Sequence, residues 1–250
     1  MRFSICSYQT NYHLLTGQLS GFLLILSLLT MNSMKAAVVI SGCGVFDGAE
    51  IHETVMTLYA LDKTGCSYQL FAPNVMQHHV INHITGEVMQ ESRNVLTEAA
   101  RIARGKVKAL TEYRAADYDA LIFPGGFGVA KNLCTYAFDG PECSVDRVVE
   151  EAILTTHKAR KPIGALCISP VLIAKVLGDV TVTIGNDPAT TAHLTALGAK
   201  HERKAHGEVA VDRQNLIVTA PCYMLDATVS DIARDAEEVV KALMKLTGKG

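Results

Sequence analysis

The chain has 250 residues, of which 49% are hydrophobic and 19% are charged, and its formal net charge is −2. This balance supplies apolar material for one sizeable core and gives little sign of disorder. A charge near zero without a basic run excludes the electrostatic footprint of a nucleic-acid-binding protein, so we expect small molecules or proteins as partners. The seven cysteines include no Cys-x-x-Cys pair, which argues against a disulfide framework or a zinc site and predicts a reducing, cytoplasmic location.

Residues 1–33 precede a region, residues 34–250, that we expect to form a single domain. Residues 19–29 are apolar and resemble the hydrophobic region of a signal peptide, but the run is too short to predict a membrane span. Arg2 is the one fixed charge before it, and residues 30–33 make a poor cleavage site. We interpret this extension first as an upstream start codon assigned in error; a signal or membrane anchor and an organelle-targeting segment are the alternatives.

The domain opens with an apolar segment, residues 36–40, that predicts a strand. A glycine-flanked loop containing Cys43 follows and leads through Asp47, a candidate turn or cap residue, into a helix over residues 50–63. Glu53 lies on the first turn of this helix and is expected to point at the crevice where the first strand ends. Cys43 either borders the same crevice or is simply accommodated in a tight loop.

Strand-like and helix-like segments alternate along the rest of the chain. The predicted strands are residues 67–71, 120–122, 162–166, 180–184 and 216–219, and the predicted helices are residues 94–104, 144–160 and 227–246, with another helix after residue 170. This alternation predicts an α/β domain with a mainly parallel, doubly wound sheet and helices on both faces. Ligands bind such sheets at the carboxyl ends of the strands.

A glycine-rich turn, residues 123–128, follows the predicted strand 120–122. A Pro-Gly-Gly sequence by itself indicates only a turn. Here, however, Gly125 and Gly126 allow backbone N–H groups to approach a substrate without a Cβ in the way. The amides of Gly126 and Ile168 are therefore candidates to hold a developing oxyanion.

Cys167 lies where the predicted strand 162–166 gives way to a helix. This context predicts a nucleophile elbow, with the side chain at a helix N-terminus, where unpaired N–H groups favour an anion. We therefore expect a reactive thiolate at neutral pH. A buried cysteine that acts as a small hydrophobe is the alternative.

These motifs together resemble the ThiJ/PfpI superfamily of class I glutamine-amidotransferase-like domains, and within it the ElbB branch. The resemblance extends from about Met34 to the C-terminal helix. It is carried by the segments 41–45, 48–55, 80–87, 93–96, 98–102, 125–128 and 130–133, by the Pro124-Gly125-Gly126 turn and by the Cys167 elbow. The resemblance implies a flavodoxin-like, three-layer fold and a homodimer.

The resemblance also implies a glyoxalase that needs neither cofactor nor metal. Cys167 would add to an aldehyde carbon, and Glu53, which matches the family carboxylate next to the cysteine, would shuttle a proton. Glyoxal, giving glycolate, is the simplest substrate, and glycated groups present the same carbon. The alternative function is a redox sensor or stress-linked interaction protein in which Cys167 is oxidised reversibly.

The chain departs from the superfamily pattern in one respect. Members with peptidase-like or strong deglycase chemistry usually have a histidine beside the nucleophile, often directly after it, where this chain has Ile168. We therefore consider His83 a substitute that caps the crevice, with a loop-stabilising role as the alternative. The Gly-x-Cys-x-Gly-Gln pattern of glutaminases is missing around Cys167, and no phosphate loop or Asp-rich motif indicates a prenyl-diphosphate site.

Overall fold

The structure is a computed structural model that describes residues 33–249. The expected N-terminal extension, apart from Ser33, lies outside the described residues. The backbone contacts delimit Met34–Gly250 as one compact unit. Among residues 33–249, no helix is both long enough and apolar enough to cross a membrane.

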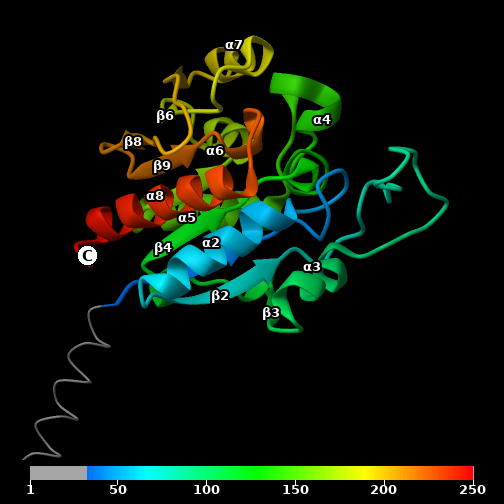
Figure 1. Cartoon of the computed structure of the whole chain (residues 1–250), viewed down its shortest axis with the longest axis horizontal. Coiled ribbons are helices and arrows are strands. Elements are labelled where there is room, and N and C mark those ends of the chain that lie inside the picture. The colour runs from blue at the N-terminus through cyan, green and yellow to red at the C-terminus, as the bar shows by residue number, and fades with distance from the viewer. Residues whose placement is uncertain (1–32, 250) are drawn as a thin grey trace, which may run out of the picture. The chain divides into compact units, whose positions relative to one another are not determined.

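Strands and helices alternate along this unit (Figure 1). The longer elements are β1 (Lys35–Val39), α2 (Ile51–Lys63), β2 (Ser67–Ala72), α3 (Val95–Ala103), β3 (Val107–Ala109), β4 (Ala120–Phe123), α4 (Tyr136–Asp139), α5 (Arg147–Lys158), β5 (Ile163–Leu166), α6 (Ser169–Leu177), β6 (Thr181–Val182), α7 (Pro188–Ala196), β7 (Lys200–His201), β8 (Ala210–Asp212), β9 (Ile217–Ala220) and α8 (Val229–Thr247). The short turns are η1 (Leu110–Glu112), η2 (Ala115–Asp117), the π-helical η3 (Val129–Leu133), η4 (Gly140–Glu142) and η5 (Cys222–Met224).

Helices α3, α5, α7 and α8 begin at residues whose side chains satisfy free backbone amides. Asn94 caps α3, Asp146 caps α5 and Asp187 caps α7, each through a side-chain oxygen that accepts from an amide of the first turn. Thr228 and Asp231 form a capping box at the start of α8. The sequence therefore marks these helix starts locally.

The central sheet of the described chain has the strand order β3-β2-β1-β4-β5-β9-β8. Its strands pair in parallel except for β8, which runs antiparallel to β9. Successive residues of β1 face opposite sides, so that Val38 packs into one apolar cluster and Val39 into the other. The predicted mainly parallel, three-layer α/β fold is confirmed.

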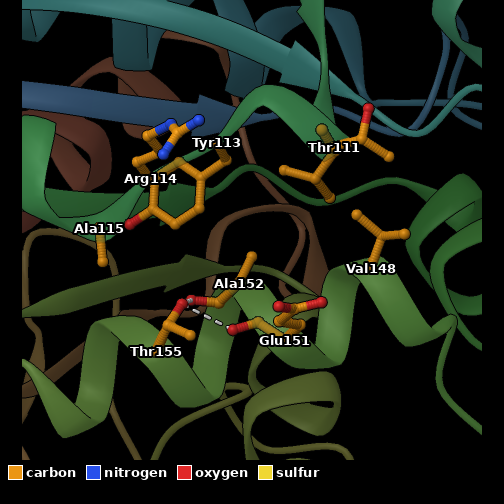
Figure 2. A pocket seen from close by; sticks show the side chains of 9 residues that line it. Thr111, Tyr113, Arg114, Ala115, Val148, Glu151, Ala152 and Thr155 are labelled. Carbon is orange, nitrogen blue, oxygen red and sulfur yellow. Dashed lines mark hydrogen bonds between the residues drawn. The ribbon is translucent and has the colours of Figure 1, made fainter.

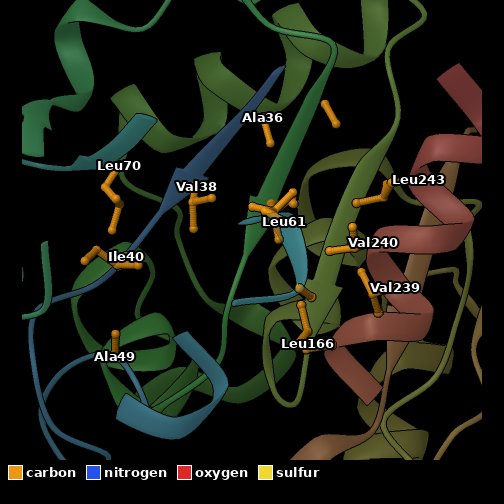
Figure 3. Close-up of a cluster of buried hydrophobic side chains, with 14 of the residues drawn as sticks. Ala36, Val38, Ile40, Ala49, Leu61, Leu70, Leu166, Val239, Val240 and Leu243 are labelled. Carbon is orange, nitrogen blue, oxygen red and sulfur yellow. The ribbon is translucent and has the colours of Figure 1, made fainter. Parts of the chain in front are cut away.

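Two apolar clusters cover the two faces of the sheet. Figure 3 shows the first cluster, to which Val38 of β1, Leu61 of α2, and Val239 and Leu243 of α8 contribute. Helices α2 and α8 lie side by side over this face (Figure 1). The second cluster contains residues of α5 and α6, including Ile153. Because both faces are covered, the central strands β4, β5 and β9 are buried at every residue.

Some elements differ from the predictions. The segment predicted as a strand at 180–184 contributes only β6, which pairs with β7 in a separate two-stranded sheet. The sequence analysis did not identify β3, β8 or α7. These elements are short or weakly amphipathic, and their pairing depends on contacts between distant parts of the chain.

The sheet has its topological switch point between β1 and β4, because successive strands are added in opposite directions from there. The loops that follow β1 and β4 are joined directly. The amide of Glu50 donates to the carbonyl of Gly125 (3.0 Å), and the amide of Phe127 donates to the carbonyl of Val45 (2.8 Å). The fold therefore places the glycine-rich turn and the start of α2 at one edge of the sheet.

Candidate active site

Cys167 occupies a strained turn between β5 and α6. Its φ is +62°, a left-handed conformation that non-glycine residues rarely adopt. The turn is held by its amide, which donates to Ala220 O (3.0 Å), and by Ser169 Oγ, which donates to Pro124 O (2.9 Å). The expected strand-to-helix elbow is therefore present and is tied to the glycine-rich turn.

Glu53 lies beside this cysteine in a fully buried position on the first turn of α2. Its Oε2 accepts from the Gly125 amide (2.9 Å), and its Oε1 accepts from the Tyr223 amide (3.2 Å). The Cys167 thiol is also hydrogen-bonded to this carboxyl group. Three segments that are far apart in the sequence thus fix a single carboxyl group against a single sulfur.

Gly125 is required by this close approach. A Cβ at this position would lie 2.5 Å from Cys167 Cβ and 2.5 Å from Glu53 Oε2. Gly126 has a φ of +104°, and a Cβ there would lie 2.3 Å from the Glu50 amide nitrogen. The paired glycines therefore serve both the turn and the contact between thiol and carboxyl group.

Burial raises the pKa of both groups, and the neighbouring carboxyl group raises the pKa of the thiol further. Burial is the main cause that raises the pKa of Glu53 from 4.5 to about 8, against the opposing effect of its hydrogen bonds. Burial and the neighbouring Glu53 raise the pKa of Cys167 well above 9.0. The expected ready thiolate is therefore wrong for the resting site: the cysteine is a thiol that can pass its proton to Glu53 once that carboxyl group is ionised.

The amides of Gly126 and Ile168 both point at the Cys167 sulfur. Their hydrogen bonds lower the pKa of Cys167, although burial and Glu53 outweigh them. Donors arranged in this way stabilise negative charge on the sulfur, or on an oxygen of a carbon atom that is bonded to the sulfur. The structure thus brings together Cys167, Glu53, Gly125, Gly126 and Ile168, as the sequence analysis expected.

A cavity of about 320 Å³ opens in front of the thiol. Its walls include Val45, Phe127 and Met224, the rings of Tyr136 and Tyr223, and the carboxyl-bearing residues Glu50 and Asp187. Sequence reasoning assigned no site role to Tyr136, Tyr223 or Met224, because no motif surrounds them. Asp187 also caps α7, because its Oδ2 accepts from the Thr190 amide (2.6 Å).

The turn that carries Tyr223 is held by a buried carboxylate on α8. Asp235 Oδ2 accepts from the Cys222 amide (3.1 Å) and pairs with His206 Nδ1 (2.9 Å). Burial opposes the protonation of His206, but the hydrogen bond to Asp235 raises its pKa. Cys222 has a φ of +45°. Asp235 therefore helps to place the Tyr223 amide that binds Glu53.

His83 lies elsewhere and does not line the cavity. Its Nε2 accepts from the Phe46 amide (3.2 Å), and its Nδ1 lies 3.0 Å from Ile81 O. These contacts give it the loop-stabilising role, so its expected position over the crevice is wrong. His52 instead bonds the Tyr223 hydroxyl through Nδ1 (2.9 Å).

Cys43 does not line the cavity either. Burial, with a further contribution from Glu98, raises its pKa. The interpretation that its glycine-flanked loop simply accommodates it agrees with this position.

A second pair of thiols, Cys134 and Cys143, lies near the wall formed by α4. Both are buried and free. A hydrogen bond from Cys134 is the main cause that lowers the pKa of Cys143 to about 7, with a further contribution from the charge of Lys175. The same interaction raises the pKa of Cys134. Neither sulfur lines the cavity in front of Cys167.

Another cavity, of about 220 Å³, lies between η1, η2 and α5 (Figure 2). Arg114 and Glu151 are its charged residues, and it contains no nucleophilic thiol or buried carboxyl group. Among the described residues, no cluster of His, Cys, Asp or Glu could hold a metal ion. The cavity at Cys167 is therefore the candidate active site.

The comparisons with known proteins agree with this geometry. The chain is 48% identical over 225 residues to human glutamine amidotransferase-like class 1 domain-containing protein 3, mitochondrial, covering 86% of this chain and 84% of the relative. It is 34% identical over 232 residues to the ES1 protein, mitochondrial, of Danio rerio, covering 85% of this chain and 86% of the relative. No family model matches the chain.

A solved structure decides the branch. The crystal structure of an isoprenoid biosynthesis protein with an amidotransferase-like domain from Ehrlichia chaffeensis is 34% identical, with a TM-score of 0.80 over 86% of this chain and 99% of that one. The chain belongs to the ElbB-like, glutamine-amidotransferase-like family of the ThiJ/PfpI superfamily. The fold is shared more widely: glyoxalase III from Candida albicans, 16% identical, has a TM-score of 0.54 over 84% of this chain and 97% of that one.

The names of the relatives correct one expectation. The human, rat and zebrafish proteins are each named as mitochondrial. These names contradict the expected cytoplasmic location, which rested on cysteine usage alone. Cysteine usage reports on redox conditions and does not distinguish one reducing compartment from another.

Proposed function

We propose that this protein is a cofactor-independent glyoxalase that converts a 2-oxoaldehyde to a 2-hydroxy acid. The observation that carries the proposal is the buried contact between the Cys167 thiol and the Glu53 carboxyl group, with the Gly126 and Ile168 amides directed at the same sulfur. A nucleophile, a proton carrier and oxyanion donors therefore meet at one cavity. Membership of a superfamily whose fold is shared by a glyoxalase III supports the same reaction.

The reaction begins with proton transfer from the Cys167 thiol to the ionised Glu53. The sulfur then forms a bond to the aldehyde carbon, and the oxygen of the resulting hemithioacetal lies near the Gly126 and Ile168 amides before it takes a proton. Glu53, ionised again, removes the hydrogen of the former aldehyde carbon as a proton and returns it to the neighbouring carbon, while the hydroxyl proton of the former aldehyde carbon passes to the neighbouring carbonyl oxygen. This leaves a thioester, which water cleaves to the 2-hydroxy acid and the free thiol.

For glyoxal, this sequence adds one water and gives glycolate, with no net oxidation or reduction. In a glycated amine the same carbon bears the amine as a hemiaminal; the sulfur forms its bond to this carbon as the C–N bond breaks and the free amine leaves, which gives the same hemithioacetal, so deglycation belongs to the same proposal. Because the chemistry balances without an external oxidant, hydride carrier or metal ion, the residues named above suffice for each step.

The experiment measures glycolate formation from glyoxal by the full chain, with Cys167→Ala as the test variant and Cys66→Ala as a matched control. Cys66 is also a buried free cysteine, and it does not line the cavity. We expect turnover in the wild type and in the control, and none above the buffer rate in Cys167→Ala. Equal rates in all three proteins, or no 2-hydroxy acid from the wild type with glyoxal or any other 2-oxoaldehyde, would refute the proposal.

The redox-sensor alternative is less well supported. A sensor cysteine is accessible and has a low pKa, whereas Cys167 is buried and its pKa is raised. A homodimer, which family resemblance alone suggests, remains a separate proposal that sedimentation of the full chain would test.

A further inference from the structure

The cavity in front of Cys167 is larger and more apolar than glyoxal requires. Its volume of about 320 Å³ lies in the range of small-molecule sites, which begins at roughly 300 Å³. Glyoxal has four non-hydrogen atoms and two polar ends, and would leave much of this space filled with water. Val45, Ala130 and Met224 supply apolar walls. A molecule as small and polar as glyoxal would bury little of this apolar surface, so the hydrophobic effect would add little to its binding.

The charged groups that line the cavity are both acidic. Asp187 is ionised at neutral pH, because its hydrogen bonds with Thr190 lower its pKa, and Glu50 provides a second carboxyl group. Among the described residues that line the cavity there is no Lys, Arg or His. The neighbouring cation, Lys131, lies over the ring of Phe127 and donates to Phe46 O (2.8 Å) without lining the cavity.

We propose that this site selects neutral 2-oxoaldehydes that carry an apolar substituent, and that its carboxylates disfavour anionic substrates and promote release of the anionic 2-hydroxy acid. This inference rests on the proposed function and adds the substrate class to it. The aldehyde carbon would lie at Cys167, and the substituent would extend between Met224 and the Tyr136 and Tyr223 rings. A neutral molecule enters and a carboxylate leaves, so the acidic walls act on the product and not on the substrate.

The first test compares kcat/KM of the full chain for glyoxal, methylglyoxal, isobutylglyoxal and phenylglyoxal. Burial of one methylene contributes about 0.8 kcal/mol, or roughly fourfold, so we expect at least a tenfold rise from methylglyoxal to isobutylglyoxal. A flat or falling series would overturn the inference and leave the glyoxalase proposal intact.

Two variants locate the effect in the cavity. Ala137 is exposed on α4 and lines the cavity, so Ala137→Leu should narrow it and lower kcat/KM for phenylglyoxal more than for glyoxal. Ala116→Leu, at an exposed position of η2 away from the cavity, is the matched control and should leave the ratio of the two unchanged. An equal effect of both variants would contradict the assignment.

A binding measurement separates this inference from the reaction itself. Acetophenone and benzoate share a phenyl ring, but only benzoate is charged. Acetophenone should slow alkylation of Cys167 by iodoacetamide, followed by mass spectrometry, and benzoate at the same concentration should not. Asp187→Asn, which keeps a good helix cap, should allow benzoate to protect better.

The outcomes distinguish the two proposals. Protection by acetophenone without turnover of any aldehyde would refute the glyoxalase and support the apolar, anion-excluding site. Turnover with equal protection by both compounds would support the glyoxalase and refute this inference.

Discussion

Two pairs of buried groups in this protein each contain a thiol whose pKa is strongly shifted, but the two shifts are opposite in direction. At the first, Cys167 faces a carboxyl group that raises its pKa. At the second, Cys143 accepts a hydrogen bond from Cys134 and interacts with the positive charge of Lys175, so its pKa falls to about 7. Judged by pKa alone, Cys143 would be chosen as the nucleophile.

For the proposed reaction, the pKa of the resting thiol does not identify the nucleophile. Cys167 has a cavity in front of it, two amides directed at its sulfur and a carboxyl group that can take its proton. Cys143 lies outside that cavity. A proton acceptor in contact allows the thiolate to form when a substrate is present, and the resting thiol is protected until then.

The two pairs should differ most in the effect that replacement of each cysteine has on kcat. Cys167→Ser should lower kcat for a 2-oxoaldehyde by about a thousandfold or more, because the attacking sulfur is lost. Cys143→Ser should stay within about twofold of the wild type, since its sulfur touches no reacting atom. Steady-state kinetics with both purified variants measures this, and comparable losses in the two would remove the distinction.

The role of Glu53 should appear in the pH dependence. The base must be ionised and its pKa is about 8, so activity should rise about tenfold between pH 7 and pH 9. Glu53→Gln should be slower by roughly 10²- to 10⁴-fold and should lose this rise. A wild-type profile that falls over this range would show that Glu53 acts in its protonated form.

The same carboxyl group should make the stability of the fold depend on pH. The folded pKa of Glu53 is raised from 4.5 to about 8, so the folded state keeps a proton that the unfolded chain releases. Its stabilising contribution is fully present below pH 4.5 and is lost as pH rises toward 8, by on the order of 5 kcal/mol. Urea unfolding should show this decline in the wild type and a weaker one in Glu53→Gln.

A smaller effect should follow from the support behind Glu53. Asp235→Asn would present an amide group to the Cys222 and Gly207 N–H donors that Asp235 now binds. The Tyr223 amide would then bind Glu53 less well, and the midpoint of the pH profile should move upward by up to about one unit.

Glu238→Gln, on the exposed surface of the same helix, is the control for this shift, because its partner Lys241 is also on the surface. An unchanged midpoint in Asp235→Asn, with normal folding, would show that the η5 turn holds its position without Asp235.

The reactive groups themselves could be predicted because their signals are local. Cys167 follows a short apolar strand and precedes a helix, and Gly125 and Gly126 follow another strand, so a parallel sheet necessarily brings these segments to one edge. Glu53 was placed by its match to a family motif on the first helical turn. The alternation of strands and helices was sufficient for the fold class, since the apolar sides of helices cover both faces of the sheet.

Tertiary structure decided which residues surround these groups and how their pKa values are shifted. Tyr223, Met224 and Asp235 belong to segments with no motif, and they reach the site only because β9 pairs with β5 and α8 packs beside α2. The raised pKa of Cys167 is likewise a property of burial next to Glu53, which the local elbow could not reveal. Sequence determines which chemical groups stand at the strand ends, and the packing of distant segments sets their solvent exposure, their charge and the shape of the cavity before them.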